Sequence, residues 1–308
     1  MQPAITAWVE EVALPGQRIA STRTLTGGFS NDNTVLTMVG GDRYVLRRYL
    51  GDNKCALEAA LARQLTGRVP VAEVIGADRD GDKAGEPVLL SRFVPGVPVN
   101  ELDEAALTEI GDEVGGTLAR IGAVEFETPG FFDGDRLAGA GHLVPDGAEL
   151  TEGLDGWVDR CLTEGNATGH LTDAEQRALR AWAREAAPEL GVLKGSRRLV
   201  HSDYNPKNLL AARSADGRWQ VAAVLDWEFA FSSTPLVDIG NMLRFPRSPA
   251  FTDAFLGGFR EAGGDLPQNW RRLSQALDLF ALADFLTRPV GHRYFGKAVD
   301  RIRVMLSH

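Results

Sequence analysis

The sequence is poor in cysteine and has no long apolar run at its start. Its two cysteines, Cys55 and Cys161, lie far apart and form no motif. A disulfide-stapled secreted scaffold is therefore disfavoured, and a reducing compartment is expected. Residues 1–11 contain acids where a signal peptide or a membrane span would be apolar, which predicts a cytoplasmic protein that does not enter a membrane.

Low-complexity tracts, internal repeats and an excess of basic residues are also missing. The 308 residues are 44% apolar and 24% charged, which is typical of a globular protein of about two domains. Residues 1–95 hold 11 basic and 11 acidic residues, so the remaining 22 basic and 31 acidic residues carry the whole net charge of -9.

A negative C-terminal part disfavours nucleic acid as a partner and attracts cations. If its acids converge on a cleft, they favour a cationic small molecule; the alternative is that they only solvate the surface. The candidate acids are Asp133, Asp135, Glu149, Glu152, Asp155, Asp159, Glu261, Asp265 and Asp284.

One polar segment, His201 to Asn208, lies between short apolar runs and is expected to be a loop between two strands. Asp203 and Asn208 are separated by four residues, with Pro206 between them to stiffen the turn. A carboxylate that orients an acceptor hydroxyl and an amide oxygen that holds magnesium are what phosphoryl transfer needs. Asp and Asn are also common turn residues, so an ordinary turn is the alternative.

A second carboxylate ends the apolar, strand-like run 221–225. Asp226 would be costly at the end of a buried strand unless a cation meets it, and magnesium bridging nucleotide phosphates would do so. A hairpin turning at residues 214–217 would bring Asp203, Asn208 and Asp226 to one end. The alternative is an ordinary acid that terminates a strand.

Three motifs in this order resemble the aminoglycoside phosphotransferase family and its choline-kinase-like relatives. They are His201 to Asn208, Leu225 to Glu228 and Pro235 to Gly240. The resemblance implies small-molecule kinase activity and a protein-kinase-like α+β fold, with an antiparallel-sheet N-lobe and a mainly helical C-lobe. The N-lobe is expected over residues 1–94 and the C-lobe, with the catalytic loop and the acceptor site, over residues 95–308.

The same resemblance implies roles for individual residues. Asp203 would be the catalytic base, and Asn208 and Asp226 would hold Mg2+. Asp238 would brace the catalytic loop, and His201 would pack beneath that loop in a structural role rather than act as an acid or base.

The chain departs from the family pattern at two places. Ser202 stands where the family usually has glycine. A serine adopts fewer backbone conformations than glycine, so the backbone angles expected for this loop are less certain to form. Trp227 and Glu228 follow Asp226 where protein kinases have Phe and Gly. Neither change replaces an expected metal ligand.

The N-terminal part is expected to hold the nucleotide. Strand-like residues 19–26 and 34–39 flank a turn that contains Gly27, Gly28, Ser30 and Asn31. Backbone amides in such a turn can approach phosphates closely, and similar turns occur in the family. The sequence lacks the G-x-G-x-x-G pattern of protein kinases, and a plain hairpin turn is the alternative.

A cation is expected on the next strand, residues 43–48. Arg47 stands where protein kinases have a lysine, and Arg48 would point to the opposite face because side chains alternate along a strand. Glu58, near the start of the helix expected over residues 54–66, would pair with Arg47 and aim it at the phosphates. Alternatively, Arg47 is solvent-exposed and Glu58 is a first-turn acid favoured by the helix dipole.

The run 87–96 ends in Pro-Gly and is expected to be the hinge between lobes. Backbone groups around Ser91, Phe93 and Val94 would hydrogen-bond the purine, which leaves ATP and GTP equally suitable. Helices are expected beyond it over residues 101–121, 157–161, 173–187, 251–262, 270–286 and 301–306.

Together these features predict a magnesium-dependent kinase that moves the terminal phosphate of ATP or GTP to a hydroxyl of a small cationic acceptor. An aminoglycoside or basic peptide antibiotic is the preferred acceptor, with resistance as the outcome. The alternatives are a kinase for choline, homoserine or a sugar, and an inactive kinase-like binding module. No obligate protein partner is evident.

Overall fold

The computed structural model describes residues 1–307 except 26–30, 135–136, 138–141 and 293. Two compact units emerge from the packing of the chain. Unit 1 comprises residues 1–110, 132–144 and 206–229, and unit 2 comprises residues 111–131, 145–205 and 230–308. Both units are therefore assembled from segments that are distant in the sequence.

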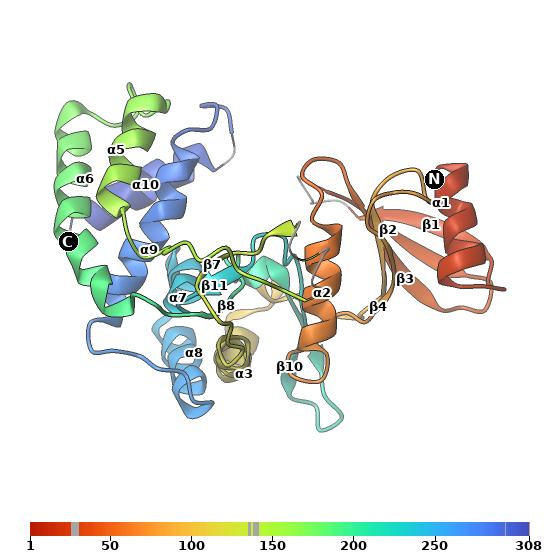
Figure 1. The fold of residues 1–308 in the computed structure, drawn as a ribbon. Coiled ribbons are helices and arrows are strands. Elements are labelled where there is room, and N and C mark those ends of the chain that lie inside the picture. The colour runs from red at the N-terminus through yellow and green to blue at the C-terminus, as the bar shows by residue number, and fades with distance from the viewer. Residues whose placement is uncertain (26–30, 135–136, 138–141, 293, 308) are drawn as a thin grey trace. The chain divides into compact units, whose positions relative to one another are not determined.

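Unit 1 is built on a five-stranded antiparallel sheet with strand order β1-β2-β3-β5-β4 (Figure 1). Within it, Thr34 pairs with Thr24 on one side and with Leu46 on the other. Over its first five residues, strand β3 alternates between buried and more exposed positions, as expected for a strand with one face on a core. The strands are β1 (Ile19–Leu25), β2 (Asn31–Met38), β3 (Arg43–Tyr49), β4 (Val74–Asp78) and β5 (Val88–Arg92).

Helical segments bury the apolar side chains of this sheet. The N-terminal α1 (Pro3–Ala7) and the π-helical turn Trp8–Ala13 contribute Ile5 and Trp8 to a core with Leu36 and Leu46. The helix α2 (Cys55–Leu65) contributes Cys55 and Ala59 to a second cluster with Tyr49 and Leu89. Burial of these side chains is the main source of stability for the sheet.

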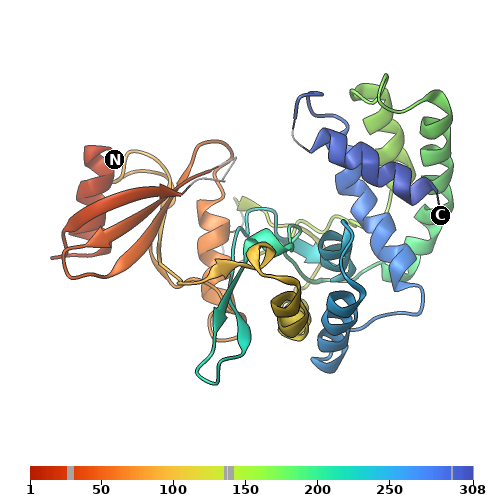
Figure 2. The same ribbon diagram turned by 180° about the vertical axis from the view of Figure 1, so that it is seen from behind.

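A second, three-stranded antiparallel sheet in unit 1 has the order β10-β9-β6. Strands β9 (Leu209–Arg213) and β10 (Trp219–Val224) form a hairpin, and the short β6 (Val97–Pro98) pairs with β9. The hairpin is drawn in teal in Figure 2. Its turn is closed by a hydrogen bond from the amide of Gly217 to the carbonyl of Ser214, where the sequence predicted it.

Unit 2 combines a small sheet of order β7-β11-β8 with a group of helices. Strand β8 leads directly into the segment that begins at His201. The strands are β7 (Gly130–Phe131), β8 (Arg198–Val200) and β11 (Phe231–Ser233), and the helices are α5 (Leu154–Glu164), α6 (Asp173–Ala186), α7 (Leu236–Leu243), α8 (Pro249–Glu261), α9 (Trp270–Phe285) and α10 (Phe295–Leu306). Helix α9 packs against α5, α7 and α10 (Figure 1).

Helix α3 (Glu104–Gly122) runs through both units, with the boundary after Ile110. Gly115 allows α3 to approach α8 closely, because a Cβ there would lie 1.9 Å from the carbonyl oxygen of Phe255. None of the helices in the described part of the chain is both long and apolar enough to cross a lipid bilayer.

The predicted α+β fold with an antiparallel N-terminal sheet and a helical C-terminal part is confirmed. Element boundaries were less accurate: the helix expected from residue 101 begins at Glu104 after a 3-10 turn, and the one expected from Arg301 begins at Phe295. The helical turns over residues 3–13 were missed because the segment is too short to show a clear period. The lobe division at residue 94 stays a prediction.

Candidate active site

Arg47 is the centre of a buried cluster of charges in unit 1. Its side chain is 13% exposed, and its Nη2 atom donates to Oδ1 of Asp226 at 2.5 Å. Its Nε atom lies 3.2 Å from Oε2 of Glu58, and Nη2 lies 3.7 Å from Oε2 of Glu228. One guanidinium therefore faces three carboxylates, which a planar fork of donors suits better than a single ammonium.

Arg48, the next residue on β3, points to the other face of the sheet. It forms ion pairs with Asp32, at 2.9 Å, and with Glu86. The alternation predicted for the two arginines is therefore present, and Arg47 and Glu58 are brought together as predicted. Burial alone would lower the pKa of Arg47, but Glu58 and Asp226 raise it above its usual value.

Glu58 is held from two sides within this cluster. The hydroxyl of Tyr49 donates a short hydrogen bond to Oε2 of Glu58, the oxygen that also faces Arg47. Burial raises the pKa of Glu58 to about 7, while Arg47 and the Tyr49 hydroxyl act in the opposite direction. Tyr49 was not predicted as a site residue, although its alternation with Arg47 on β3 places both side chains on one face.

Asn31 is the last residue of the predicted glycine-containing turn, and the structure describes it. Asn31 is buried, and its Nδ2 atom donates to Oε2 of Glu228 at 2.8 Å. Gly27, Gly28 and Ser30 lie outside the described residues. Glu228 was not predicted as a site residue; the signal that could have revealed it is a second acid two residues after Asp226.

Asn208 and Asp226 flank the base of the β9–β10 hairpin. The amide of Leu225 donates to the carbonyl of Asn208 at 2.8 Å, so the two predicted metal ligands emerge next to paired residues. Asp226 has a φ of +68° in the left-handed region, which is unusual for a residue other than glycine. Such a turn redirects the chain as β10 ends, and strained residues of this kind are concentrated at functional sites.

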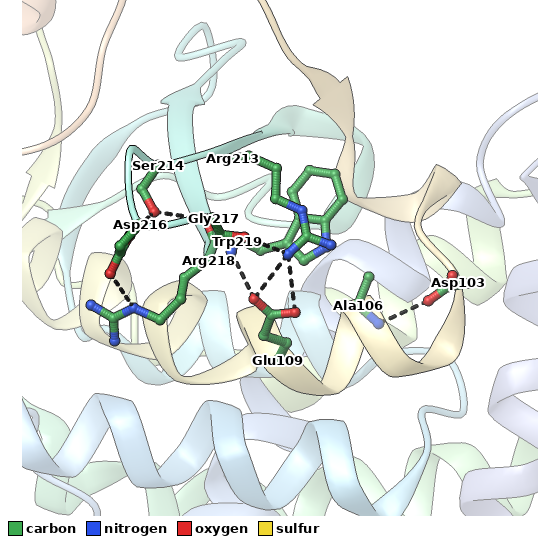
Figure 3. A network of polar contacts seen from close by, with 9 residues as sticks. All are labelled: Asp103, Ala106, Glu109, Arg213, Ser214, Asp216, Gly217, Arg218 and Trp219. Atoms are coloured by element: carbon green, nitrogen blue, oxygen red, sulfur yellow. Dashed lines mark hydrogen bonds and ion pairs between the residues drawn. The ribbon is translucent and has the colours of Figure 1, made fainter.

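The far end of the same hairpin is tied to α3 by charged and aromatic side chains (Figure 3). Glu109 accepts from the amide of Trp219 at 2.9 Å and from Arg213 at 3.2 Å. Arg213 also lies over the Trp219 ring, 4.2 Å from its centroid. These contacts fix the hairpin relative to the N-terminal turns of α3 within unit 1.

The cluster in unit 1 has the chemistry of a magnesium site. Asp226 and Asn208 carry oxygen atoms that could serve as ligands, and among the described residues Oδ1 of Asn31 and Oε1 of Glu58 are buried without a hydrogen-bond partner. In the described part of the chain, no group of three or more His, Cys, Asp or Glu forms a ready-made metal cage. A metal that keeps several water and phosphate ligands fits this arrangement, as magnesium does.

In unit 2, the segment after β8 is held by the carboxylate of Asp238. Oδ2 of Asp238 accepts from the amide of His201 and Oδ1 accepts from the amide of Ser202, both at 2.8 Å. Asp238 is fully buried, and this burial raises its pKa to about 7 against the effect of the two amides. The carboxylate thereby fixes Ser202 at a φ of +68°, the conformation for which glycine was expected.

Asp203 is oriented by its neighbours in the same unit. Its amide donates to Nδ1 of the fully buried His201 at 3.2 Å, and its carboxylate accepts from Nδ2 of Asn205 at 2.8 Å. The Tyr204 hydroxyl donates to the carbonyl of Val114 on α3 at 2.8 Å. Asn205 was not predicted as a contributor to the loop.

The expected hinge residues lie at the end of β5 and directly after it, within unit 1. Ser91 pairs with Val45 in β3, and the amide of Phe93 donates to the carbonyl of Arg43 at 3.0 Å. The guanidinium of Arg43 also lies 4.1 Å from the centroid of the Phe93 ring. A purine-binding role for Ser91, Phe93 and Val94 stays a prediction.

Several of the candidate acids are neutralised by neighbouring groups within unit 2. Glu152 pairs with Lys194 and Asp159 with Arg180, each at 2.6 Å, and Asp284 pairs with Arg288 at 3.0 Å. Glu149 accepts from the amide of Gly195 at 2.8 Å. Asp135 lies outside the described residues. These contacts therefore reduce the negative charge that is available to bind a cationic acceptor.

Comparison with known proteins decides the family. Residues 21–275 match the model of the phosphotransferase enzyme family. The chain belongs to this family. The resemblance stated from the three motifs is thereby confirmed, and so is the prediction of a small-molecule kinase. No curated protein sequence matches this phosphotransferase at a significant level.

Solved structures share the fold of this phosphotransferase at low identity. The aminoglycoside phosphotransferase APH(4)-Ia is 19% identical, with a TM-score of 0.68 over 94% of each chain. A variant of that protein in complex with AMP-PNP and hygromycin B has a TM-score of 0.69. The macrolide 2'-phosphotransferase MphH of Brachybacterium faecium is 20% identical, with a TM-score of 0.61 over 95% of this chain and 93% of that one.

Proposed function

We propose that this phosphotransferase moves the terminal phosphate of ATP or GTP to a hydroxyl group of a small molecule. The observation that carries the proposal is the Arg47 cluster, in which one guanidinium faces Glu58, Asp226 and Glu228. Three carboxylates against one cation leave an excess of negative charge that a magnesium ion would compensate, and a magnesium ion also binds the phosphates of a nucleotide. The solved structures of similar fold with bound AMP-PNP or ADP agree with a nucleotide donor.

Each residue of the proposed site has its own role in this mechanism. Asn208 and Asp226 would hold magnesium, which when bound neutralises charge on the phosphates. Arg47, kept in place by Glu58, binds phosphate oxygens, and Asn31 lies beside the same cluster through Glu228. Asp203, oriented by Asn205, accepts or aligns the proton of the acceptor hydroxyl. Positioning and electrostatics supply most of the acceleration.

The preferred acceptor is an aminoglycoside or another cationic antibiotic, with cellular resistance as the consequence. It is supported by the excess of acids beyond residue 95 and by the hygromycin B complexes of the similar fold. The second candidate is a hydroxyl-bearing metabolite such as choline, homoserine or a sugar. The local ion pairs of Glu152, Asp159 and Asp284 favour this second candidate, because they reduce the charge left for a polycation.

A coupled assay of nucleoside-diphosphate release tests both levels of the proposal. The full chain is assayed with ATP or GTP and magnesium against cationic antibiotics, amino alcohols and sugars. Turnover should depend on one acceptor class and should fall by at least about a thousandfold in Asp203→Asn, as expected for loss of a catalytic acid–base group together with its alignment of the acceptor.

The matched control is Asp253→Asn, an exposed acid on α8 far in sequence from the loop. Unchanged turnover in Asp203→Asn would overturn the catalytic assignment. Turnover of a metabolite without any response to antibiotics would overturn the preferred acceptor while leaving the reaction in place.

A further inference from the structure

A cavity in unit 2 is lined by arginines from three helices. It has a volume of about 100 Å³. It lies between the C-terminal end of α7, one face of α9 and the residue Arg301 of α10. Its polar lining consists of Arg244, Arg271, Ser274, Gln275, Asp278 and Arg301. None of these residues belongs to the proposed catalytic or nucleotide-binding groups.

The charges around this cavity do not cancel. Arg244 is neutralised by Asp278, to which it donates from Nη2 at 2.7 Å and from Nε at 3.0 and 3.1 Å. Among the residues that the structure describes, neither Arg271 nor Arg301 has a carboxylate within ion-pairing distance. The cavity therefore carries two uncompensated positive charges on a protein with a net charge of -9.

Arg271 packs against an aromatic ring. The guanidinium of Arg271 lies over the ring of Trp270, 4.5 Å from its centroid. Stacking restrains a guanidinium without using its N–H donors, so these donors stay available to a ligand. The amide of Gln275, one turn further along α9, adds a hydrogen-bond donor to the same wall, while the hydroxyl of Ser274 donates to the carbonyl of Arg271 at 3.1 Å.

We propose that this cavity binds a small oxyanion, with a phosphate group as the best match. Arginine forks recognise phosphate oxygens through paired, charge-assisted hydrogen bonds. The cavity volume of about 100 Å³ is sufficient for one phosphate group. The phosphate could be the free inorganic ion or the exposed end of a phosphate monoester, because both present the same oxygens.

The cavity is linked to the catalytic loop by a buried side chain. Asn241 on α7 donates to the carbonyl of Ser202 at 2.7 Å and accepts from Nη2 of Arg244 at 3.2 Å, in the amide orientation that satisfies both neighbours. An anion that draws on Arg244 would act through Asn241 on the residue next to Asp203. The link predicts that occupancy of the cavity stabilises this loop.

Calorimetric titration of the full chain at constant ionic strength tests the site. Inorganic phosphate is one titrant and glycerol phosphate, a monoester, is the other. We expect saturable one-site binding of phosphate, weakened at least tenfold by Arg271→Gln and by Arg301→Gln. Binding should be unchanged in Arg177→Gln, an exposed arginine of α6 outside the cavity, and in Arg47→Gln, which lies in the nucleotide cluster.

The outcomes separate the alternatives. Binding that does not saturate, or that Arg271→Gln and Arg301→Gln leave unchanged, overturns the proposal; loss of binding in Arg47→Gln alone assigns the phosphate to the nucleotide cluster and overturns it too. Binding of the monoester together with the free ion assigns the site to organic phosphates, and binding of the free ion alone assigns it to inorganic phosphate. Neither result depends on whether the chain transfers phosphate.

The link to the loop has its own readout in hydrogen exchange. Phosphate should slow exchange of the amide of Ser202, and Asn241→Ala should abolish this slowing while the cavity still binds phosphate. Equal exchange with and without bound phosphate overturns the link.

Discussion

Arg47→Lys should tighten the binding of magnesium while it lowers the stability of the fold. In the structure the guanidinium reaches Glu58 from Nε and Asp226 from Nη2 at the same time. A lysine carries one ammonium on a flexible stem and cannot reproduce this fork. The substitution therefore frees Asp226, a proposed metal ligand, from a competing cation.

The magnitude follows from the contact that is lost. A hydrogen bond between charged groups contributes about 1.5–3 kcal/mol, and because Asp226 is 32% exposed we take about 1–2 kcal/mol for this one. At about 1.4 kcal/mol per factor of ten, the apparent affinity for magnesium should rise by about 5- to 30-fold. The free energy of unfolding should fall by a similar 1–2 kcal/mol in the absence of metal.

The measurement is a magnesium titration by calorimetry, together with urea unfolding, for the wild type and Arg47→Lys. Arg48→Lys is the matched control, because Arg48 lies on the same strand but pairs with Asp32 and Glu86 instead. Equal magnesium affinity in Arg47→Lys and the wild type would refute the competition between Arg47 and the metal. An equal gain in Arg48→Lys would show that the effect is one of general charge.

Three further substitutions test single contacts of the site. Ser202→Gly should stabilise the fold by about 0.5–1 kcal/mol, because glycine adopts the φ of +68° without the strain of about 1–2 kcal/mol, and its greater loss of freedom on folding offsets only part of this gain. Tyr49→Phe should destabilise it by about 1–2 kcal/mol through loss of the hydrogen bond to Glu58. Asp238 has a folded pKa of about 7 and an ordinary value of 3.8, so its contribution to stability is full below the ordinary value and is lost as the pH rises through about 7. Titration of Asp238 should therefore lower the free energy of unfolding by about 2.5 kcal/mol between pH 5 and 8, and Asp238→Asn should remove this part of the dependence while the part from Glu58, whose pKa is also about 7, stays.

Urea unfolding reads out each of these changes. A destabilised Ser202→Gly would mean that the serine side chain makes contacts that outweigh backbone strain. An unchanged free energy of unfolding in Tyr49→Phe would show that the hydrogen bond from Tyr49 to Glu58 does not stabilise the fold. A pH dependence of undiminished size in Asp238→Asn would assign the whole titration to another group, with Glu58 as the first to test.

Local sequence pattern was sufficient for the elements that depend on neighbouring residues. The alternation of buried residues on β3 separates Arg47 from Arg48, and the turn residues 214–217 close the hairpin at the predicted place. Amphipathic spacing locates α3, α8 and α9 to within a few residues. These features depend on neighbours within one or two turns, which a single sequence displays directly.

Local pattern was insufficient where partners are distant in the sequence. The pairing of Asn31 with Glu228 joins residues 197 positions apart, and Glu228 had no assigned role before the structure showed this contact. The ion pairs that neutralise Glu152 and Asp159 were equally hidden, since they join side chains of separate segments. Composition counts charges but does not say which of them are paired.

The sequence alone determined the family, the order of its motifs and the residue types available for phosphoryl transfer, because motif spacing is a property of the chain. Only the tertiary structure decided how Arg47 is shared among Glu58, Asp226 and Glu228. It also decided that Ser202 takes a left-handed conformation in which its amide donates to Asp238. The physical reason is that burial removes water as a partner, so each charge must find another side chain, and that choice depends on which strands and helices pack together.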